Sequence, residues 1–404
     1  MAPLRAPAPV RPQSSHAITA TLVLVVAINP ATLYLFLPAM PAIQTAFGTD
    51  TATTQLSLSL ALAAMTPATL LYGPISDAFG RRATLLVAAA LIVLGSAIAA
   101  TSPSIVVLII GRVIQACGAA AGPVLAISIV FDLHGDQRAG PALARILVWM
   151  VVATMVTPTI GGLLTDYSGW RSNFVTTMVL GIVLLAAVWY SLPETHPAPD
   201  RAALEPGRLV RANTRLLRHP MFLGYSLMVA FSMAIVYAFM SAAPHIMVRQ
   251  MGRSASEFGI NLIGVALGFL IGNMMAARWT ALVGRERMIA AGGLFSLTAC
   301  AGLMMALLGG AVTPSTIFVP AIIAAIACGL SMPNAEAAAI GVVPELSGAA
   351  SSLVNGLVLL TSAIVSQVVG STLADTAYPL GIAMTTAAAL ALASFIAGAA
   401  VHRR

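Results

Sequence analysis

The stretch GPISDAFGRR, residues 73–82, is a short charged segment between two long apolar runs. The flanking residues, 54–72 and 83–100, carry no charged side chain. Glycine and proline mark turns, and an apolar run of about 20 residues is long enough to cross a bilayer as a helix. The stretch therefore predicts a charged hinge between two membrane spans, at one surface of a membrane.

The composition of the chain excludes a soluble globule. Of its 404 residues, 59% are hydrophobic and only 8% are charged, whereas soluble domains carry about 25% charged residues. The net charge of +7 is also found in nucleic-acid-binding proteins, but here the basic residues are scattered between apolar runs and form no stripe. The three cysteines lie singly inside apolar runs, which argues against a disulfide or metal framework.

Apolar segments of similar length recur along the whole chain, and each predicts one membrane helix. The predicted spans are 17–39, 54–72, 83–101, 105–131, 142–164, 172–192, 220–243, 256–277, 288–309, 316–340, 347–372 and 377–400. We therefore expect an all-α membrane protein with twelve transmembrane helices in two pseudo-symmetric six-helix bundles. Residues 17–192 would form the first bundle and 220–404 the second, with a tail at 1–16 and a proline- and arginine-rich linker at 193–219.

The two halves echo each other in sequence. Gly284 and Arg285 fall between spans eight and nine, where Gly80 and Arg81 fall between spans two and three. Two similar bundles joined by a polar linker are a common construction of secondary transporters, with a substrate site between the halves near the membrane midplane.

The arginines give the expected orientation, because the chain has no lysine and basic residues favour the cytoplasmic side. If both termini are inside, only Arg171, Arg249 and Arg253 lie in outer loops. The hinge, the linker and both termini are therefore expected at the cytoplasmic face of a bacterial inner membrane.

Four stretches, in sequence order, resemble motifs of the major facilitator superfamily. They are the hinge with the preceding residues 70–72, residues 111–118 continuing to Asp132, residues 157–162 with 169–171, and residues 333–335 with 348–352. Together they are similar to the bicyclomycin/chloramphenicol-resistance (Bcr/CflA-type) branch of the twelve-helix drug:proton antiporters. The resemblance touches both halves of the chain.

The resemblance implies that the hinge is a gate. A helix N-terminus favours a nearby carboxylate; the resemblance implies that Asp77 meets the N-terminus of span eleven and that Arg81 meets Asp132. Such contacts would latch the halves on the cytoplasmic side and break when the protein opens inward. The other expected gating residues are Arg82, Gly73, Gly80, Pro158, Gly161 and Gly162. The alternative is a charge cluster that only sets topology.

Two positions depart from the family pattern. Ala78 stands where the hinge usually has an arginine directly after the aspartate. Tyr34 stands where the first helix of this branch usually carries an acid, and a phenol with an ordinary pKa near 10 cannot titrate near neutral pH. The usual proton site of the branch is therefore missing.

Polar residues inside spans are the candidates for substrate binding. Arg112 lies within the fourth span, where a guanidinium costs at least about 2.5 kcal/mol on insertion scales and needs partners or water. Gln115 lies one turn away on the same face. The alternative for Arg112 is a purely structural hydrogen bond to the backbone of the first or second helix. The other residues expected to line a mostly apolar cavity are Tyr34, Tyr237, Asn261 and Asn334.

Glu336 is the candidate proton carrier, because it is the remaining carboxylic acid within the apolar part of a span. Asp166 and Asp375 are expected in outer loops with nothing to perturb them. The alternative for Glu336 is a carboxylate that only reaches the aqueous edge.

The motifs of nucleotide-driven pumps and membrane hydrolases are missing, since the chain has no phosphate-binding loop, no nucleophile elbow and no metal-ligand cluster. We expect no cofactor, no metal and no enzyme activity. The expected function is a secondary transporter that exports small amphipathic compounds in exchange for protons. Its partners would be a small-molecule substrate, protons and the lipid bilayer, without nucleic acid, and it would act as a monomer. The alternatives are an importer or facilitator of a small polar metabolite, and a transport-inactive membrane sensor or assembly protein.

Overall fold

The computed structural model describes residues 15–196, 205–373 and 376–402. The first fourteen residues of the expected tail, residues 197–204 of the expected linker, and Asp375 lie outside this part of the chain. The described residues form helices and connecting turns, without a β-strand. Twelve segments among them are long and apolar enough to cross a membrane, which confirms the predicted fold class.

The helices of the first half are α1 Ser15–Tyr34, η1 Leu37–Ala39, α2 Met40–Phe47, α3 Thr51–Phe79, α4 Arg81–Ala100, α5 Ile105–Ala119, α6 Ala121–Ser168 and α7 Arg171–Ser191. Those that follow are α8 Pro206–Leu217, α9 Pro220–His245, η3 Ile246–Gln250, α10 Ala255–Val283, α11 Arg285–Leu308, α12 Pro314–Gly341, η4 Pro344–Leu346, α13 Ser347–Thr372 and α14 Tyr378–His402.

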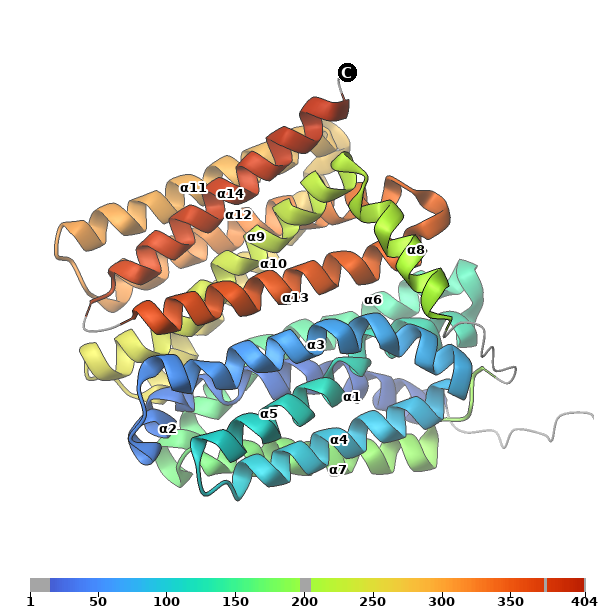
Figure 1. The fold of residues 1–404 in the computed structure, drawn as a ribbon, viewed down its shortest axis with the longest axis horizontal. Coiled ribbons are helices and arrows are strands. Elements are labelled where there is room, and N and C mark those ends of the chain that lie inside the picture. The colour runs from blue at the N-terminus through green and yellow to red at the C-terminus, as the bar shows by residue number, and fades with distance from the viewer. Residues whose placement is uncertain (1–14, 197–204, 374–375, 403–404) are drawn as a thin grey trace, which may run out of the picture.

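The spans run side by side in two groups (Figure 1). In the first half α4 packs against α5 and α7, and α1 packs against α6; in the second half α9 packs against α14, and α12 lies against both α10 and α11. The largest contacts between the halves are those of α3 with α13 and of α6 with α10. We call the end with the α3–α4 and α10–α11 turns the hinge end, and the opposite end the far end.

The α3–α4 turn is much shorter than the sequence predicted. Helix α3 continues through Pro74 to Phe79, and α4 begins at Arg81, so that Gly80 alone makes the turn. The prediction of a ten-residue polar turn is therefore wrong. A helix tolerates an interior proline when it accepts the loss of one backbone hydrogen bond, and the polar residues before Gly80 form the last turns of α3.

The predicted echo between the halves appears directly in the backbone. Gly80 has φ 95° and ψ 150°, and Gly284, between α10 and α11, has φ 94° and ψ 145°. This region of conformational space is essentially closed to residues with a Cβ atom. Both turns therefore require glycine, and the two halves use the same one-residue connection.

The first and fifth spans also differ from the predicted continuous helices. Helix α1 ends at Tyr34, and the chain continues as η1 and α2, with Pro38 and Pro41 in the first turns of those two elements. Helix α6 joins the end of the fourth span to the fifth through a kink at Gly135, where φ is 66°. The predicted linker contains an unpredicted helix, α8, which packs against α9 and α13.

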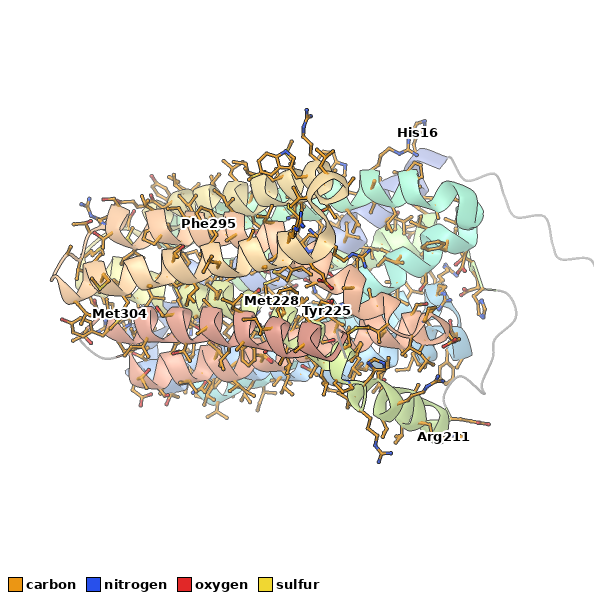
Figure 2. All side chains as sticks on the ribbon, turned by 90° about the horizontal axis from the view of Figure 1, so that it is seen from above. His16, Arg211, Tyr225, Met228, Phe295 and Met304 are labelled. Carbon is orange, nitrogen blue, oxygen red and sulfur yellow. The ribbon has the colours of Figure 1, made fainter. Side chains whose placement is uncertain are left out.

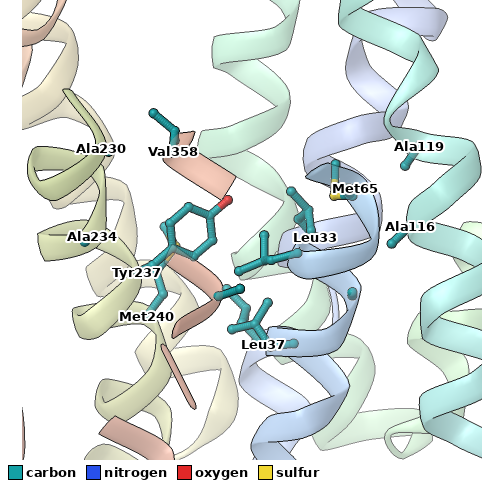
Figure 3. Packing of buried hydrophobic residues seen from close by; sticks show 14 of the residues in the cluster. Leu33, Leu37, Met65, Ala116, Ala119, Ala230, Ala234, Tyr237, Met240 and Val358 are labelled. Atoms are coloured by element: carbon teal, nitrogen blue, oxygen red, sulfur yellow. The ribbon is translucent and has the colours of Figure 1, made fainter. Parts of the chain in front are cut away.

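Most of the buried apolar side chains belong to one cluster that extends through both halves, and a small second cluster lies among α10, α11 and α12. Figure 3 shows the centre of the larger cluster, where Tyr237 and Met240 of α9 face Leu33 and Leu37 of the first half. The halves are therefore held together by apolar packing, on which the polar contacts described below are superimposed.

The two glycine turns give a matched test. Gly284→Ala should lower the stability of the purified protein by about 1–3 kcal/mol, the usual strain of this backbone region, because an added Cβ meets no neighbouring atom there. Gly80→Ala should lower it further, because its Cβ would overlap the carboxylate of Glu194. The midpoint of thermal unfolding in detergent measures both effects. Equal midpoints for the two variants would show that steric overlap with Glu194 adds no cost at residue 80.

Candidate functional site

Arg81 is the centre of the hinge. Its side chain is buried and lies between two carboxylates, with Nη1 2.5 Å from Asp77 Oδ1 and Nε 3.2 Å from Asp132 Oδ2. It also donates to the Ser76 hydroxyl. Charge-assisted hydrogen bonds of this kind are stronger than neutral ones. The structure thus brings together three of the predicted gating residues, all within the first half.

Glu194 is a hinge residue that the sequence analysis missed. Its carboxylate accepts hydrogen bonds from the backbone amides of Arg81 (2.8 Å) and Arg82 (3.2 Å), the first two residues of α4. The first amides of a helix have no partner within the helix, and the helix dipole favours an anion there. The next residue, Thr195, donates to Asp132. The only sign of this role in the sequence is that an acidic residue directly follows the last apolar residues of span six.

Arg82 ties the hinge to α7. Its Nη2 donates to the Trp189 carbonyl at 2.7 Å, and its guanidinium lies 5.4 Å from the centroid of the Trp189 ring. By contrast, an added Cβ at Gly73 would meet no atom within 4 Å. The structure therefore gives no steric reason for a glycine at residue 73.

The implied latch between Asp77 and span eleven is not formed in this structure. Asp77 pairs with Arg81 of its own half, and within the described residues no hydrogen bond joins it to the first turn of α13. Its side chain is 38% exposed. The hinge end therefore lacks the contact that would hold the two halves together there.

The far end is joined by buried polar contacts. Gln55 of α3 donates to Ser241 of α9 at 2.8 Å and to Ser366 of α13 at 2.6 Å. Ser59, one turn further along α3, donates to Gln367 of α13 at 2.6 Å. Buried hydrogen bonds between elements far apart in sequence require well-defined packing. They therefore fix the two halves against each other at the far end.

Asp166 makes a second polar contact between the two halves at the far end. It lies at the end of α6, and its carboxylate accepts from the amides of Ser256 (2.9 Å) and Ala255 (3.3 Å) in the first turn of α10. The expectation that Asp166 lies in an outer loop is wrong, because Asp166 belongs to the last turn of α6. Its carboxylate accepts from two amides of the other half that have no partner within their own helix.

Glycines allow α6 to approach its neighbours at this end. A Cβ at Gly161 would overlap the Leu35 carbonyl, and one at Gly162 would overlap the backbone of Ala255. Gly259 of α10 packs in the same way against Pro158. Small residues permit such close approach in membranes. The predicted motif in span five therefore lies at the contact between the halves.

Arg112 is only 1% exposed and is held within the first half. Its Nη1 donates to the Thr32 carbonyl at 2.8 Å and to Gln115 Oε1 at 2.5 Å, and its Nε to the Ser57 carbonyl at 3.4 Å. The Thr32 carbonyl is available because α1 ends at Tyr34, and the last carbonyls of a helix lack partners. The backbone hydrogen bonds to the first two helices, the alternative for this residue, are therefore present.

Two features leave Arg112 open to a further partner. Its guanidinium lies 3.8 Å from the centroid of the Phe36 ring, an attractive cation–π contact. Its Nη2 is buried and makes no hydrogen bond to the described residues. A buried donor without a partner costs free energy, so an acceptor that reached Nη2 would be favoured.

Tyr34 and Tyr237 meet between the halves. Their side chains interact between α1 and α9, and Figure 3 shows Tyr237 projecting toward the first half. The two asparagines predicted to line the same cavity lie elsewhere. Asn261 donates to the Glu257 carbonyl of its own helix, whereas Asn334 donates to its own helix and accepts from Thr280 of α10.

Glu336 lies on α12 and is half-buried. Among the described residues, no hydrogen bond or ion pair reaches its carboxylate. It lies about one and a half turns from the hinge end of α12, whose last residue is Gly341. The structure thus places it near the hinge end rather than at the tyrosine pair.

Two cavities lie at the hinge end, each within one half. One of about 690 Å³ is lined by residues of α1 and α6, including His16, His134 and Arg145. The other, of about 770 Å³, lies between α11 and α14. Neither includes a residue predicted to bind substrate.

Comparison with known sequences is consistent with this architecture. Residues 22–246 match the family described as Major Facilitator Superfamily. The uncharacterized MFS-type transporter YdgK of Bacillus subtilis is 30% identical over 91% of this chain and 92% of its own. Multidrug resistance protein D of Escherichia coli is 27% identical over 86% of each chain. A bicyclomycin resistance protein homolog of Haemophilus influenzae is 25% identical over 77% of this chain and 78% of its own.

The fold is also similar to solved structures. The xylose transporter XylE of Escherichia coli, in a partially occluded inward open conformation, superposes with a TM-score of 0.71. It shares 14% sequence identity and covers 93% of this chain and 96% of its own. With the family match over more than half of its length and the twelve-helix fold, this chain is a multi-pass membrane transporter that belongs to the major facilitator superfamily.

Proposed function

We propose that this chain exports small amphipathic, drug-like compounds across a bacterial inner membrane, in exchange for protons and by alternating access. The observation that carries the proposal is the asymmetry of its two ends: Asp166 of one half caps α10 of the other at the far end, whereas Asp77 pairs only within its own half. Two relatives, a multidrug resistance protein and a bicyclomycin resistance protein homolog, support the substrate class by their names.

The two ends offer alternative latches of the same kind. In one state Asp166 occupies the N-terminus of α10; in the other, Asp77 would occupy the N-terminus of α13. A carboxylate at a helix N-terminus is worth about 0.3–2 kcal/mol, depending on burial. Differences of this size shift a balanced equilibrium between two states without trapping either. The arginine distribution supports a cytoplasmic hinge end, and in this proposal the state in which Asp166 closes the far end faces inward.

The substrate site in this proposal lies at the midplane between residues 17–192 and 220–404, the two bundles. The Tyr34–Tyr237 pair would be separated and re-formed as the halves rock. Arg112, with its unpartnered Nη2, would offer a fixed positive charge beside it. A like charge in a space of low dielectric repels a cation, so neutral, zwitterionic and anionic compounds are the favoured substrates.

Glu336 is the proton carrier of the proposal, since a carboxyl group without a partner in a span can gain and lose a proton as its access to water changes. The second candidate function is an importer or facilitator of a small polar metabolite without proton coupling. The absence of an acid at Tyr34 favours it. Purified protein in liposomes with a pH-sensitive dye inside separates the two functions, because only an antiporter moves protons when a drug gradient is applied.

The latches predict opposite effects of two conservative variants. Asp77→Asn should weaken the state closed at the hinge end by ~1–2 kcal/mol and leave an inserted protein with little transport. Asp166→Asn should instead weaken the state closed at the far end. Distances between spin labels near the Gly80 and Gly284 turns report the hinge-end opening. If both variants shifted these distances in the same direction, or Asp77→Asn turned over normally, the gating role would be wrong.

Arg112→Ala should reduce transport of a neutral substrate without preventing insertion. Loss of one charge-assisted hydrogen bond, worth ~1.5 kcal/mol, corresponds to about a tenfold higher half-saturation concentration. Bicyclomycin and chloramphenicol are suitable neutral probes, with tetraphenylphosphonium as the cation that the wild type should disfavour. Undiminished affinity in folded Arg112→Ala would return this residue to a structural role.

Glu336→Gln should abolish accumulation driven by a pH gradient and spare downhill flux of the same compound, because the amide keeps the shape of the side chain but cannot carry the proton. Glu257→Gln is the matched control, since that carboxylate forms only a surface ion pair with Arg253. Unchanged pH-driven accumulation in Glu336→Gln would contradict the assignment.

A further inference from the structure

Helix α8 carries a row of arginines on one face. The arginines are scattered along most of the chain, but in α8 they follow helical spacing. Residues 211, 215 and 218 lie three and four positions apart, and the spacing continues back to residue 208. Positions related in this way share one face of a helix. The statement that the basic residues form no stripe is therefore wrong for this segment.

The α8 stripe, as we call Arg211, Arg215 and Arg218, points away from the protein. All three side chains are exposed, and Figure 2 shows Arg211 at the outer edge of the molecule. The opposite face of α8 packs against α9 and α13, with Leu216 fully buried. The helix is therefore held in place by its apolar side and presents its charged side outward.

Within the part of the chain that the structure describes, no acidic side chain forms an ion pair with the stripe. The residues from Pro206 to Arg218 include no aspartate or glutamate. Like charges three or four positions apart destabilise a helix, and a twelve-residue helix is marginal by itself. The stripe is thus an uncompensated local charge that an anionic partner would relieve.

The surroundings of α8 indicate which anion lies within reach. The helix lies at the hinge end, across the ends of the spans (Figure 1), where the chain leaves the membrane before α9. Two apolar side chains, Val210 at 61% and Leu217 at 40% exposure, lie beside the stripe and are not covered by protein. Arginines next to exposed apolar residues are typical of helices that lie in the interface of a membrane.

We propose that the α8 stripe binds the phosphate groups of anionic phospholipids in the leaflet at the hinge end. The guanidinium group matches phosphate oxygens with paired donors, and basic residues next to a span are attracted to anionic lipid surfaces. Val210 and Leu217 enter the acyl boundary of the same leaflet. Because α8 packs on α9 and α13, the bound lipid holds the linker against the second half.

The test uses the full-length protein in detergent, titrated with dioleoyl-phosphatidylglycerol or dioleoyl-phosphatidylcholine, with bound lipid counted by native mass spectrometry. The wild type should bind the anionic lipid at least about tenfold more tightly than the zwitterionic one. The preference should fall as salt is raised, since screening shortens from about 10 Å at 0.1 M to about 3 Å at 1 M. Equal binding of the two lipids by the wild type would overturn the proposal.

Three variants locate the binding. Replacing Arg211, Arg215 and Arg218 by glutamine should remove the preference, and replacing them by lysine should retain most of it, because lysine keeps the charge. The matched control replaces the exposed Arg278, Arg285 and Arg287 by glutamine. These arginines lie at the same end of the protein, and their replacement removes the same number of positive charges. If the control lost as much preference as the α8 variant, the basic surface in general would be the binding site and not the stripe.

The test does not depend on the folding of the triple glutamine variant. Should the glutamine variant fail to fold, as judged by its elution in size-exclusion chromatography, single Arg211→Gln and Arg215→Gln variants take its place. Each should lower the preference by a factor of a few, since each basic residue contributes separately to the attraction. Wild-type preference in both single variants would overturn the proposal.

Discussion

The arrangement of this transporter depends on how the first amides of its helices are satisfied. These amides have no partners within the helix, and in this chain serine and threonine hydroxyls cap α5, α10 and α12, while carboxylates accept from other such amides. The chain has 13 acidic residues, and three of them serve this purpose. Asp50 caps α3, with hydrogen bonds from the Thr53 side chain and backbone that lower the pKa of its carboxyl group. Glu194 caps α4 and Asp166 caps α10.

These three caps differ in what they connect. Asp50 caps the helix that follows it, and Glu194 joins two parts of the same half, so neither contact depends on how the halves are placed. Asp166 reaches the other half, and in the proposed transport cycle its contact would break when the far end opens. A single kind of interaction therefore stabilises each half in two places and joins the two halves in the third.

The sequence was sufficient to predict the spans and the fold, because hydropathy over about 20 residues is a strong signal. It was insufficient for the hinge, because polar residues with a proline at 73–79 are typical of a turn, whereas α3 continues through Pro74 to Phe79. The partner of Tyr34 lies some two hundred positions away on α9, and no local pattern indicates Tyr237. The need of Arg112 for partners was predictable, but the Thr32 carbonyl becomes free only because α1 stops at Tyr34, within a stretch where the sequence predicted an unbroken helix.

Glu194 also has a consequence for the order in which the protein is made. It completes the first turn of α4, yet it follows the sixth span in the chain. During synthesis the amides of Arg81 and Arg82 therefore wait for a partner until more than a hundred further residues have been added. The third span enters the bilayer with an unfinished end, and the first half acquires its final form only when the ribosome has passed the end of α7.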